Sequence, residues 1–220
     1  MAEEMLEIWD WQTGCPTGEA VPRSRAHLEG IPHEGVHLWV VRLCDNEPQV
    51  LFQKRALFKD SYPGYLDITV GGHVPFGLRD EKILKETEEE IGIRPAMDSL
   101  IDLGCFRYEE HEEKGRYHRE FQHVYLLRDD RDLDRYHFND GEVSAICAVS
   151  LEKLARLMKE NISFKVLHYN GSETGEETLG RENFHPLLFA DSMKEYMKVV
   201  LKAAAELIDT GRVTASMPPL

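Results

Sequence analysis

The chain has 220 residues, of which 42% are hydrophobic and 30% charged, a composition typical of a globular protein with one or two domains. This composition excludes a disordered chain, a collagen-like fibre and a small disulfide-stabilised scaffold. With 40 acidic and 26 basic residues the formal net charge is −14, so the protein repels a phosphate backbone and we expect no nucleic-acid partner. A small phosphorylated substrate is compatible with this charge if a bound cation masks the carboxylates.

Neither a targeting segment nor a membrane span is predicted. The acidic N-terminus lacks the basic start and apolar run of a signal peptide, and no window reaches the ~20 apolar residues of a membrane helix. The four cysteines, Cys15, Cys44, Cys105 and Cys147, form no CxxC pair. We therefore expect a reduced, cytoplasmic protein with no membrane partner, and a homodimer is left open.

The first third of the chain is expected to consist mostly of strands. Alternating apolar and acidic residues predict a strand over residues 6–9, and glycines and prolines indicate a turn-rich stretch over residues 14–22. Runs of β-branched and aromatic residues predict strands over residues 36–43 and 50–54, joined by a polar turn. A third short strand over residues 65–70 ends at a Gly-Gly pair.

Helical periodicity begins after this pair. Over residues 80–91 the apolar side chains fall on one stripe, Asp80 is placed to cap the start, and Gly92 suits the position that ends a helix. The later segments are predicted as strands at 100–108, 120–127 and 143–149, a helix at 151–160, a polar loop at 170–183, a helix at 192–208 and a frayed tail. This order predicts one α/β (α+β) core with a helix among several strands.

Three glutamates of the central helix, Glu86, Glu89 and Glu90, share one face because of their i, i+3 and i+4 spacing. Like charges at these spacings destabilise a helix by roughly a few tenths of a kcal/mol per pair. A divalent cation offsets this repulsion, and carboxylate oxygens suit Mg²⁺ or Mn²⁺. The alternative is a solvated face on which Lys82 and Lys85 pair with Glu86 and Glu89.

The run Lys85-Glu86-Thr87-Glu88-Glu89-Glu90-Ile91-Gly92-Ile93, with the Gly-rich loop 71–77 before it, resembles the signature of Nudix hydrolases. That signature has a glycine, a loop with a glutamate, and a helix carrying Arg-Glu, an aliphatic residue, Glu-Glu and a closing glycine. Here the loop is one residue short, Leu78-Arg79 stands where the loop glutamate is expected, Lys85 replaces the arginine and Thr87 replaces the aliphatic residue.

The resemblance implies a Nudix-type α/β/α sandwich with a mixed β-sheet. The Nudix domain is expected over residues 1–183, with a C-terminal helical extension over residues 184–220 packed on the same domain. In this family the helix glutamates hold the metal, which implies Glu86, Glu89 and Glu90 as ligands of Mg²⁺ or Mn²⁺. Lys85 would orient the carboxylates, and one of the helix glutamates or Glu120 would accept a proton.

Residues outside the helix narrow the resemblance to the branch related to isopentenyl-diphosphate isomerase. The matching residues are Ala26-His27, His33, Trp39, Arg55-Ala56-Leu57, Lys59-Asp60, Pro63-Gly64, Gly72-His73 and Glu120-Phe121-Gln122-His123-Val124-Tyr125-Leu126. His27, His33 and His73 match positions that bind a metal in the isomerases. The alternatives are that His73 caps the Gly-rich turn and that His33 marks a strand entry.

Substrate contacts are implied for Arg55, Gly72 and His73. Arg55 would bind a phosphate through a forked contact, or else compensate the charge of the glutamates. Glu142 occupies a loop where related enzymes carry a base. The hairpin over residues 107–123 and the C-terminal extension would recognise the substrate, with His111, His118 and His123 facing solvent or the substrate.

The predicted function is Mg²⁺-dependent hydrolysis of a diphosphate linkage in a small nucleoside-diphosphate-type or related substrate. One rival is isomerisation of prenyl diphosphates, which needs an acid and a base on opposite sides of the substrate. The isomerases carry a cysteine where this chain has Gly71, so hydrolysis is favoured, and His73 and Cys105 are the substitutes visible in the sequence. The other rival is a non-catalytic ligand-binding Nudix domain, which the altered loop supports.

Overall fold

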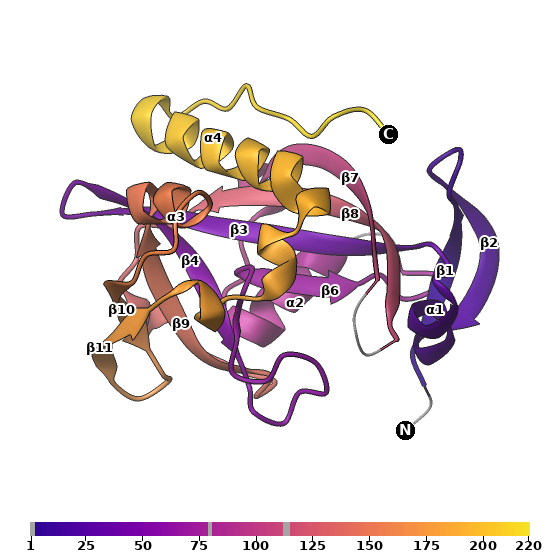
Figure 1. Cartoon of the computed structure of the whole chain (residues 1–220), viewed down its shortest axis with the longest axis horizontal. Helices are drawn as coiled ribbons and strands as arrows, with labels where there is room; N and C mark the ends of the chain where they lie inside the picture. The colour runs from indigo at the N-terminus through magenta and orange to yellow at the C-terminus, as the bar shows by residue number, and fades with distance from the viewer. Residues whose placement is uncertain (1–2, 79–80, 112–114) are drawn as a thin grey trace.

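The computed structural model describes residues 3–78, 81–111 and 115–220, which form one sheet with helices on both faces (Figure 1). The strands are β1 (Met5–Asp10), β2 (Cys15–Pro22), β3 (His33–Cys44), β4 (Glu47–Arg55), β5 (Leu66–Asp67), β6 (Val70–His73), β7 (Ile101–His111), β8 (Tyr117–Arg128), β9 (Val143–Ser150), β10 (Phe164–Tyr169) and β11 (Thr174–Leu179). The α-helices are α1 (Arg23–Glu29), α2 (Lys82–Ile91), α3 (Leu151–Leu157) and α4 (Lys194–Thr210). Short 3₁₀ turns lie at Met97–Ser99, Leu133–Arg135, Arg181–Asn183, Pro186–Phe189 and Asp191–Met193.

The sheet is mixed and centres on β3. Its strand order is β11-β10-β9-β4-β3-β1-β2, and β8 joins β3 on one side and β7 on the other. The β3–β8 pair is parallel, whereas the other pairs are antiparallel. β6 and β8 both pair with the first part of β3, whereas β4 pairs with its last part. The starts of β3 and β8 therefore lie beside the end of β6.

Two apolar cores lie on the two faces of the sheet, because side chains alternate along each strand. On one face Leu38 and Val40 of β3 pack against Ile83 of α2. On the opposite face Trp39 of β3 packs in a core with Tyr196 of α4, the helix drawn in yellow at the top of Figure 1. The predicted α/β/α sandwich with a mixed sheet is confirmed.

Local sequence accounts for the ends of several elements. Asp45 and Asn46 have φ values of 50° and 62°, so the turn between β3 and β4 is a tight two-residue hairpin. Gly92 ends α2 with a φ of 72°, and a Cβ there would lie 2.6 Å from the His137 carbonyl oxygen. The proposed cap Asp80 and the loop residue Arg79 lie outside the described residues. No helix in the described parts of the chain is long and apolar enough to cross a membrane.

Three expectations about irregular segments are wrong. The turn-rich stretch at 14–22 contains all of β2, and the loop predicted at 170–183 contains β11. Both are edge strands with mostly exposed or half-exposed side chains, and an edge strand needs little apolar surface to pair. The tail is not frayed, because the Met217 side chain is buried and its backbone N–H donates to the Leu103 carbonyl at 2.6 Å.

Candidate functional site

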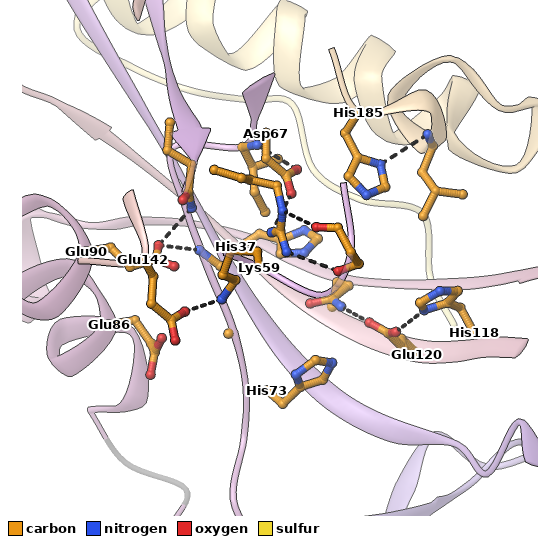
Figure 2. Close-up of a pocket in the computed structure, with 18 of the residues that line it drawn as sticks. His37, Lys59, Asp67, His73, Glu86, Glu90, His118, Glu120, Glu142 and His185 are labelled. Atoms are coloured by element: carbon orange, nitrogen blue, oxygen red, sulfur yellow. Dashed lines mark hydrogen bonds and ion pairs between the residues drawn. The ribbon is translucent and has the colours of Figure 1, made fainter. Parts of the chain in front are cut away.

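A cavity of about 460 Å³ lies where α2, the β3–β6–β8 junction and the segment before α4 meet. Its wall is largely polar (Figure 2). It includes the three helix glutamates, the side chains of His118, Glu120 and Gln122 from β8, and several basic side chains. Ile68, Leu187, Leu188 and Met193 supply an apolar patch. The cavity therefore combines charged groups for an anionic ligand with a surface for an organic group.

Glu86, Glu89 and Glu90 all line the cavity from α2. The Glu90 side chain is buried, and its Oε2 accepts hydrogen bonds from Gln53 Nε2 at 2.9 Å and from the Gly71 N–H at 3.1 Å. Burial, reinforced by Glu86, raises the pKa of Glu90 well above its ordinary value. Because both donors are neutral, they do not compensate the charge of Glu90, and this environment fits a bound cation.

Two lysines contact the other glutamates. Lys82 forms an ion pair with Glu86, and Lys85 Nζ lies 3.5 Å from Glu89 Oε1. The pairs that the solvated-face interpretation predicts are therefore present, but Lys82 is buried rather than solvated. Gly72 makes room for Glu86, since a Cβ at this position would lie 2.6 Å from Glu86 Oε2. A cation held by all three carboxylates would have to displace Lys82 from Glu86.

Thr87, which replaces the aliphatic residue of the signature, is fully buried. Its hydroxyl donates to the Ile83 carbonyl at 2.6 Å, so the polar atom is satisfied within the helix. The substitution thus leaves the packing face of α2 intact.

A second group of ligand atoms converges on the other side of the cavity. His27 of α1, His33 of β3, His73 of β6 and Glu120 of β8 place one donor atom each within 4.8 Å of one another. His33 and Glu120 are direct partners in the parallel β3–β8 register, which explains why residues so distant in sequence meet. The structure thus brings together the three histidines that the resemblance implies as metal ligands.

The hydrogen bonds fix which atoms face the centre of this histidine cluster. His33 Nδ1 lies 2.8 Å from the Ile31 carbonyl, which only accepts, so Nδ1 donates this bond and Nε2 is the nitrogen that faces the cluster. This Nε2 lies 3.8 Å from Glu120 Oε1, and His27 Nδ1 lies 3.9 Å from the same oxygen. Within the described part of the chain, both nitrogens are buried without a hydrogen-bond partner.

The protonation of the cluster suits a metal. Burial lowers the pKa of His27 to about 4 and lowers the pKa of His73 well below its ordinary value, so both rings are neutral at pH 7. Neutral imidazoles that face a carboxylate are the ligand set of Zn²⁺ and related ions. His27, His33, His73 and Glu120 therefore fit a divalent metal.

Glu120 is held in place by its neighbours on β8. His118 Nδ1 donates to Glu120 Oε1 at 2.8 Å, and Gln122 Nε2 donates to Oε2. Although burial alone would raise it, the hydrogen bond from His118 and the nearby His33 hold the pKa of Glu120 well below its ordinary value. His118 thus lines the cavity as a partner of Glu120, whereas His123 bonds to Asp102 at 3.1 Å outside it.

The basic residues of the cavity are partly neutralised. Arg55 Nη1 lies 3.2 Å from Asp67 Oδ2, so Arg55 compensates this aspartate and not the helix glutamates. Lys59 forms an ion pair with Glu142, which lies at the cavity rim (Figure 2). Arg55, Gly72 and His73, predicted as substrate-binding residues, all line the cavity.

The position of the isomerase cysteine holds Gly71, which brings no side chain to the cavity wall. A Cβ at Gly71 would lie 2.8 Å from Ile68 Cδ1, the flexible end of that side chain. Of the two substitutes visible in the sequence, Cys105 is not among the cavity residues, and burial raises its pKa to about 12.

Sequence reasoning missed His37, Asp67 and Tyr196. His37 and Asp67 line the cavity, and Tyr196 reaches His37 from α4. The alternation of β3 places His37 on the face of Trp39, which was the available signal for its orientation. No sequence pattern indicated that Tyr196 of α4 would contact His37.

Comparisons with known proteins point to one protein family. Residues 33–169 match the NUDIX domain. An uncharacterized Nudix hydrolase of Clostridium acetobutylicum is 28% identical over 209 residues, which cover 92% of this chain and 98% of the relative. Nudix hydrolase 3 of Arabidopsis thaliana is 32% identical over 178 residues, which cover 78% of this chain and 22% of the relative. A solved structure from Deinococcus radiodurans aligns over 70% of this chain and 88% of its own, with 23% identity and a TM-score of 0.52.

More distant relatives match 53% or 56% of the chain. They are two Streptomyces isopentenyl-diphosphate Delta-isomerases and a prenyl-diphosphate phosphatase of Methanosarcina mazei, at 28–32% identity. The resemblance to the isomerase-related branch therefore extends beyond the helix signature.

Proposed function

The chain belongs to the Nudix hydrolase family, enzymes that cleave diphosphate linkages and generally need divalent cations, and we propose that it hydrolyses a small nucleoside-diphosphate-type or related organic diphosphate with Mg²⁺ or Mn²⁺. The observation that carries this proposal is the placement of two carboxylate-bearing centres on one cavity. Glu86, Glu89 and Glu90 lie on one side, and Glu120 with its histidines lies on the other. Both the polar wall and the apolar patch are needed to bind an organic diphosphate.

The helix carboxylates would hold Mg²⁺ or Mn²⁺, and His27, His33, His73 and Glu120 would hold a second divalent ion. Bound there, such ions neutralise phosphate charge and make a water molecule more acidic. The chain's own groups supply the rest of the reaction. Arg55 and Lys59 would contact phosphate oxygens, since both line the cavity and could exchange their carboxylate partners, Asp67 and Glu142, for a phosphate.

The proton acceptor is assigned among the candidates by their environments. Glu120 is a weak base, because its hydrogen bonds and the nearby histidines lower its pKa, so it serves better as a ligand. Glu90 is enclosed by Gln53 and Gly71. Glu89 is half-exposed in the cavity beside Lys85, which leaves it accessible to water. We therefore assign Glu89 the role of proton acceptor.

Isomerisation is disfavoured by the glycine at position 71. Moving a double bond requires a proton donor on one side of the substrate, and glycine offers no exchangeable side-chain group. Ile68 fills the neighbouring volume with an apolar side chain. Hydrolysis needs no such group.

The test is a release assay over nucleoside diphosphates, sugar nucleotides and prenyl diphosphates, with and without Mg²⁺ or Mn²⁺. Glu89→Gln and Glu90→Gln should each remove most of the activity while the protein stays folded. Glu88→Gln is the matched control, because Glu88 lies on the same helix but is exposed and bonds to Arg94. Full activity in Glu89→Gln and Glu90→Gln, or no metal-dependent hydrolysis of any compound, would contradict the proposal.

A further inference from the structure

A hydrogen-bonded chain connects the C-terminal helix to the cavity. Trp39 Nε1 donates to the Tyr196 hydroxyl at 2.8 Å, and the same hydroxyl lies 2.8 Å from His37 Nδ1. Trp39 and Tyr196 are fully buried, whereas His37 reaches the cavity wall. The chain therefore runs from the buried core under α4 to the surface that a ligand would contact.

The donors and acceptors of this chain determine where the proton of His37 lies. The indole N–H of Trp39 can only donate, so the Tyr196 oxygen accepts from it. The tyrosine proton then remains for His37, and Nδ1 is its partner among the described residues. Nδ1 must accept this bond, which places the proton of the neutral imidazole on Nε2.

The Cδ2 edge of the His37 ring faces Gly71. A Cβ at Gly71 would lie 3.5 Å from His37 Cδ2, the carbon bonded to Nε2, and the Gly71 N–H itself donates to Glu90. In Figure 2 His37 lies between the carboxylates of α2 and the Glu120–His118 pair. His37 thus lies on the cavity wall with Nδ1 bonded to Tyr196, so Nε2 is the ring nitrogen left for a ligand.

The ring is neutral in this setting. Burial lowers the pKa of His37 to about 4, although Glu120 of β8 and Asp67 of β5 oppose this and His185 adds to it. A neutral imidazole with a fixed Nε2–H is an uncharged hydrogen-bond donor. With a pKa of about 4, its protonation state stays the same at neutral pH. Such a donor can bind an anionic oxygen without the mobility of a lysine.

We propose that His37 is a substrate-binding residue whose Nε2–H donates a hydrogen bond to a non-bridging oxygen of the bound diphosphate, and that Tyr196 is the positioning residue that holds this tautomer. The inference rests on the proposed diphosphate substrate. It also gives the C-terminal extension a role in recognition, because Tyr196 lies on α4.

The experiment begins with the tautomer, which does not depend on catalysis. In the full chain labelled with nitrogen-15 histidine, we expect His37 to show the Nε2–H form, and Tyr196→Phe to convert it to a mixture of tautomers. Methylenediphosphonate, a non-hydrolysable diphosphate, added with Mg²⁺ should shift the His37 Nε2 signal. The Nδ1–H form in the wild type, or no shift at saturating diphosphonate, would overturn the inference.

Two isosteric variants then separate the two ring nitrogens. The amide nitrogen of Asn occupies the place of Nδ1 and that of Gln the place of Nε2, so His37→Gln keeps a donor toward the cavity and His37→Asn loses it. We expect the Kd for methylenediphosphonate to rise roughly tenfold or more in His37→Asn, and clearly less in His37→Gln. Equal affinity of His37→Asn and the wild type would refute the contact.

Failure of the proposed hydrolase function would give a different result from failure of the His37 contact. If no compound is hydrolysed but diphosphonate binds and shifts the His37 signal, the hydrolase proposal fails and the His37 contact stands. If His37→Asn does not fold, the tautomer measurement and the comparison of His37→Gln with the wild type still decide the question.

Discussion

Replacing Glu90 by glutamine is expected to stabilise the metal-free protein while removing its activity. Burial, with Glu86 beside it, raises the pKa of Glu90 above the ordinary value of 4.5. Between 4.5 and this raised pKa the folded protein holds a proton that the unfolded chain has lost, so the stability of the wild type falls as pH rises through this window. Glutamine carries no charge and keeps an oxygen for the donors Gln53 and Gly71.

The size of the gain has a lower limit set by the helix. Glu86 and Glu90 form a like-charge i,i+4 pair, which costs about 0.2–0.5 kcal/mol on an exposed helix and more when buried. The penalty grows by about 1.4 kcal/mol for each pH unit within the window. Since 1 kcal/mol corresponds to roughly 2–4 °C in a chain of this size, the pair alone predicts a rise in Tm of about 0.4–2 °C in Glu90→Gln, and a larger rise toward pH 8.

The assay is urea and thermal unfolding of the wild type, Glu90→Gln and the exposed control Glu88→Gln in chelator at pH 5, 6.5 and 8. Hydrolysis with Mg²⁺ is measured on the same preparations. The control should stay within about 0.5 kcal/mol of the wild type. A Glu90→Gln variant that is less stable than the wild type at pH 8, or whose advantage does not change with pH, would show that the charge of Glu90 is already compensated.

Three further outcomes are expected. Millimolar Mn²⁺ or micromolar Zn²⁺ should raise the Tm of the wild type in calorimetry, because a ligand that binds the folded state stabilises it. His33→Gln should remove the part of this Tm shift that comes from the histidine cluster. Gly35→Ala should cost about 1–3 kcal/mol in urea unfolding, because the new Cβ would lie 2.8 Å from Gln122 Cδ and force that side chain away. The wild type should catalyse no deuterium uptake into prenyl diphosphates in heavy water, because Gly71 offers no exchangeable side-chain group; enzyme-dependent uptake by the wild type would restore the isomerase interpretation.

The sequence predicted those elements whose side chains carry a regular apolar period. The stripe of α2 and the β-branched run of β3 are long enough for periodicity to locate them. β11 could not be found in this way, because a polar edge strand is held by backbone hydrogen bonds and not by buried side chains.

The site was predictable to the extent that its ligands are local. The three helix glutamates follow from i, i+3 and i+4 spacing alone. The histidines were suggested by family resemblance, but their meeting with Glu120 depends on the parallel β3–β8 pair, which no local pattern encodes. The bond from Tyr196 to His37 joins opposite ends of the chain, so only the folded structure shows it.

The register of β3 against β8 sets both the shape of the sheet and the composition of the histidine cluster. His33 lies opposite Glu120, and Gly35 lies opposite Gln122, whose side chain crosses the glycine. A slip by one residue would turn Glu120 to the other face of the sheet and dismantle the ligand set. A metal ion bound by these four residues would stabilise the native register of β3 and β8 over a shifted one, because only the native register assembles the ligand set. Metal binding would then favour correct strand pairing during folding.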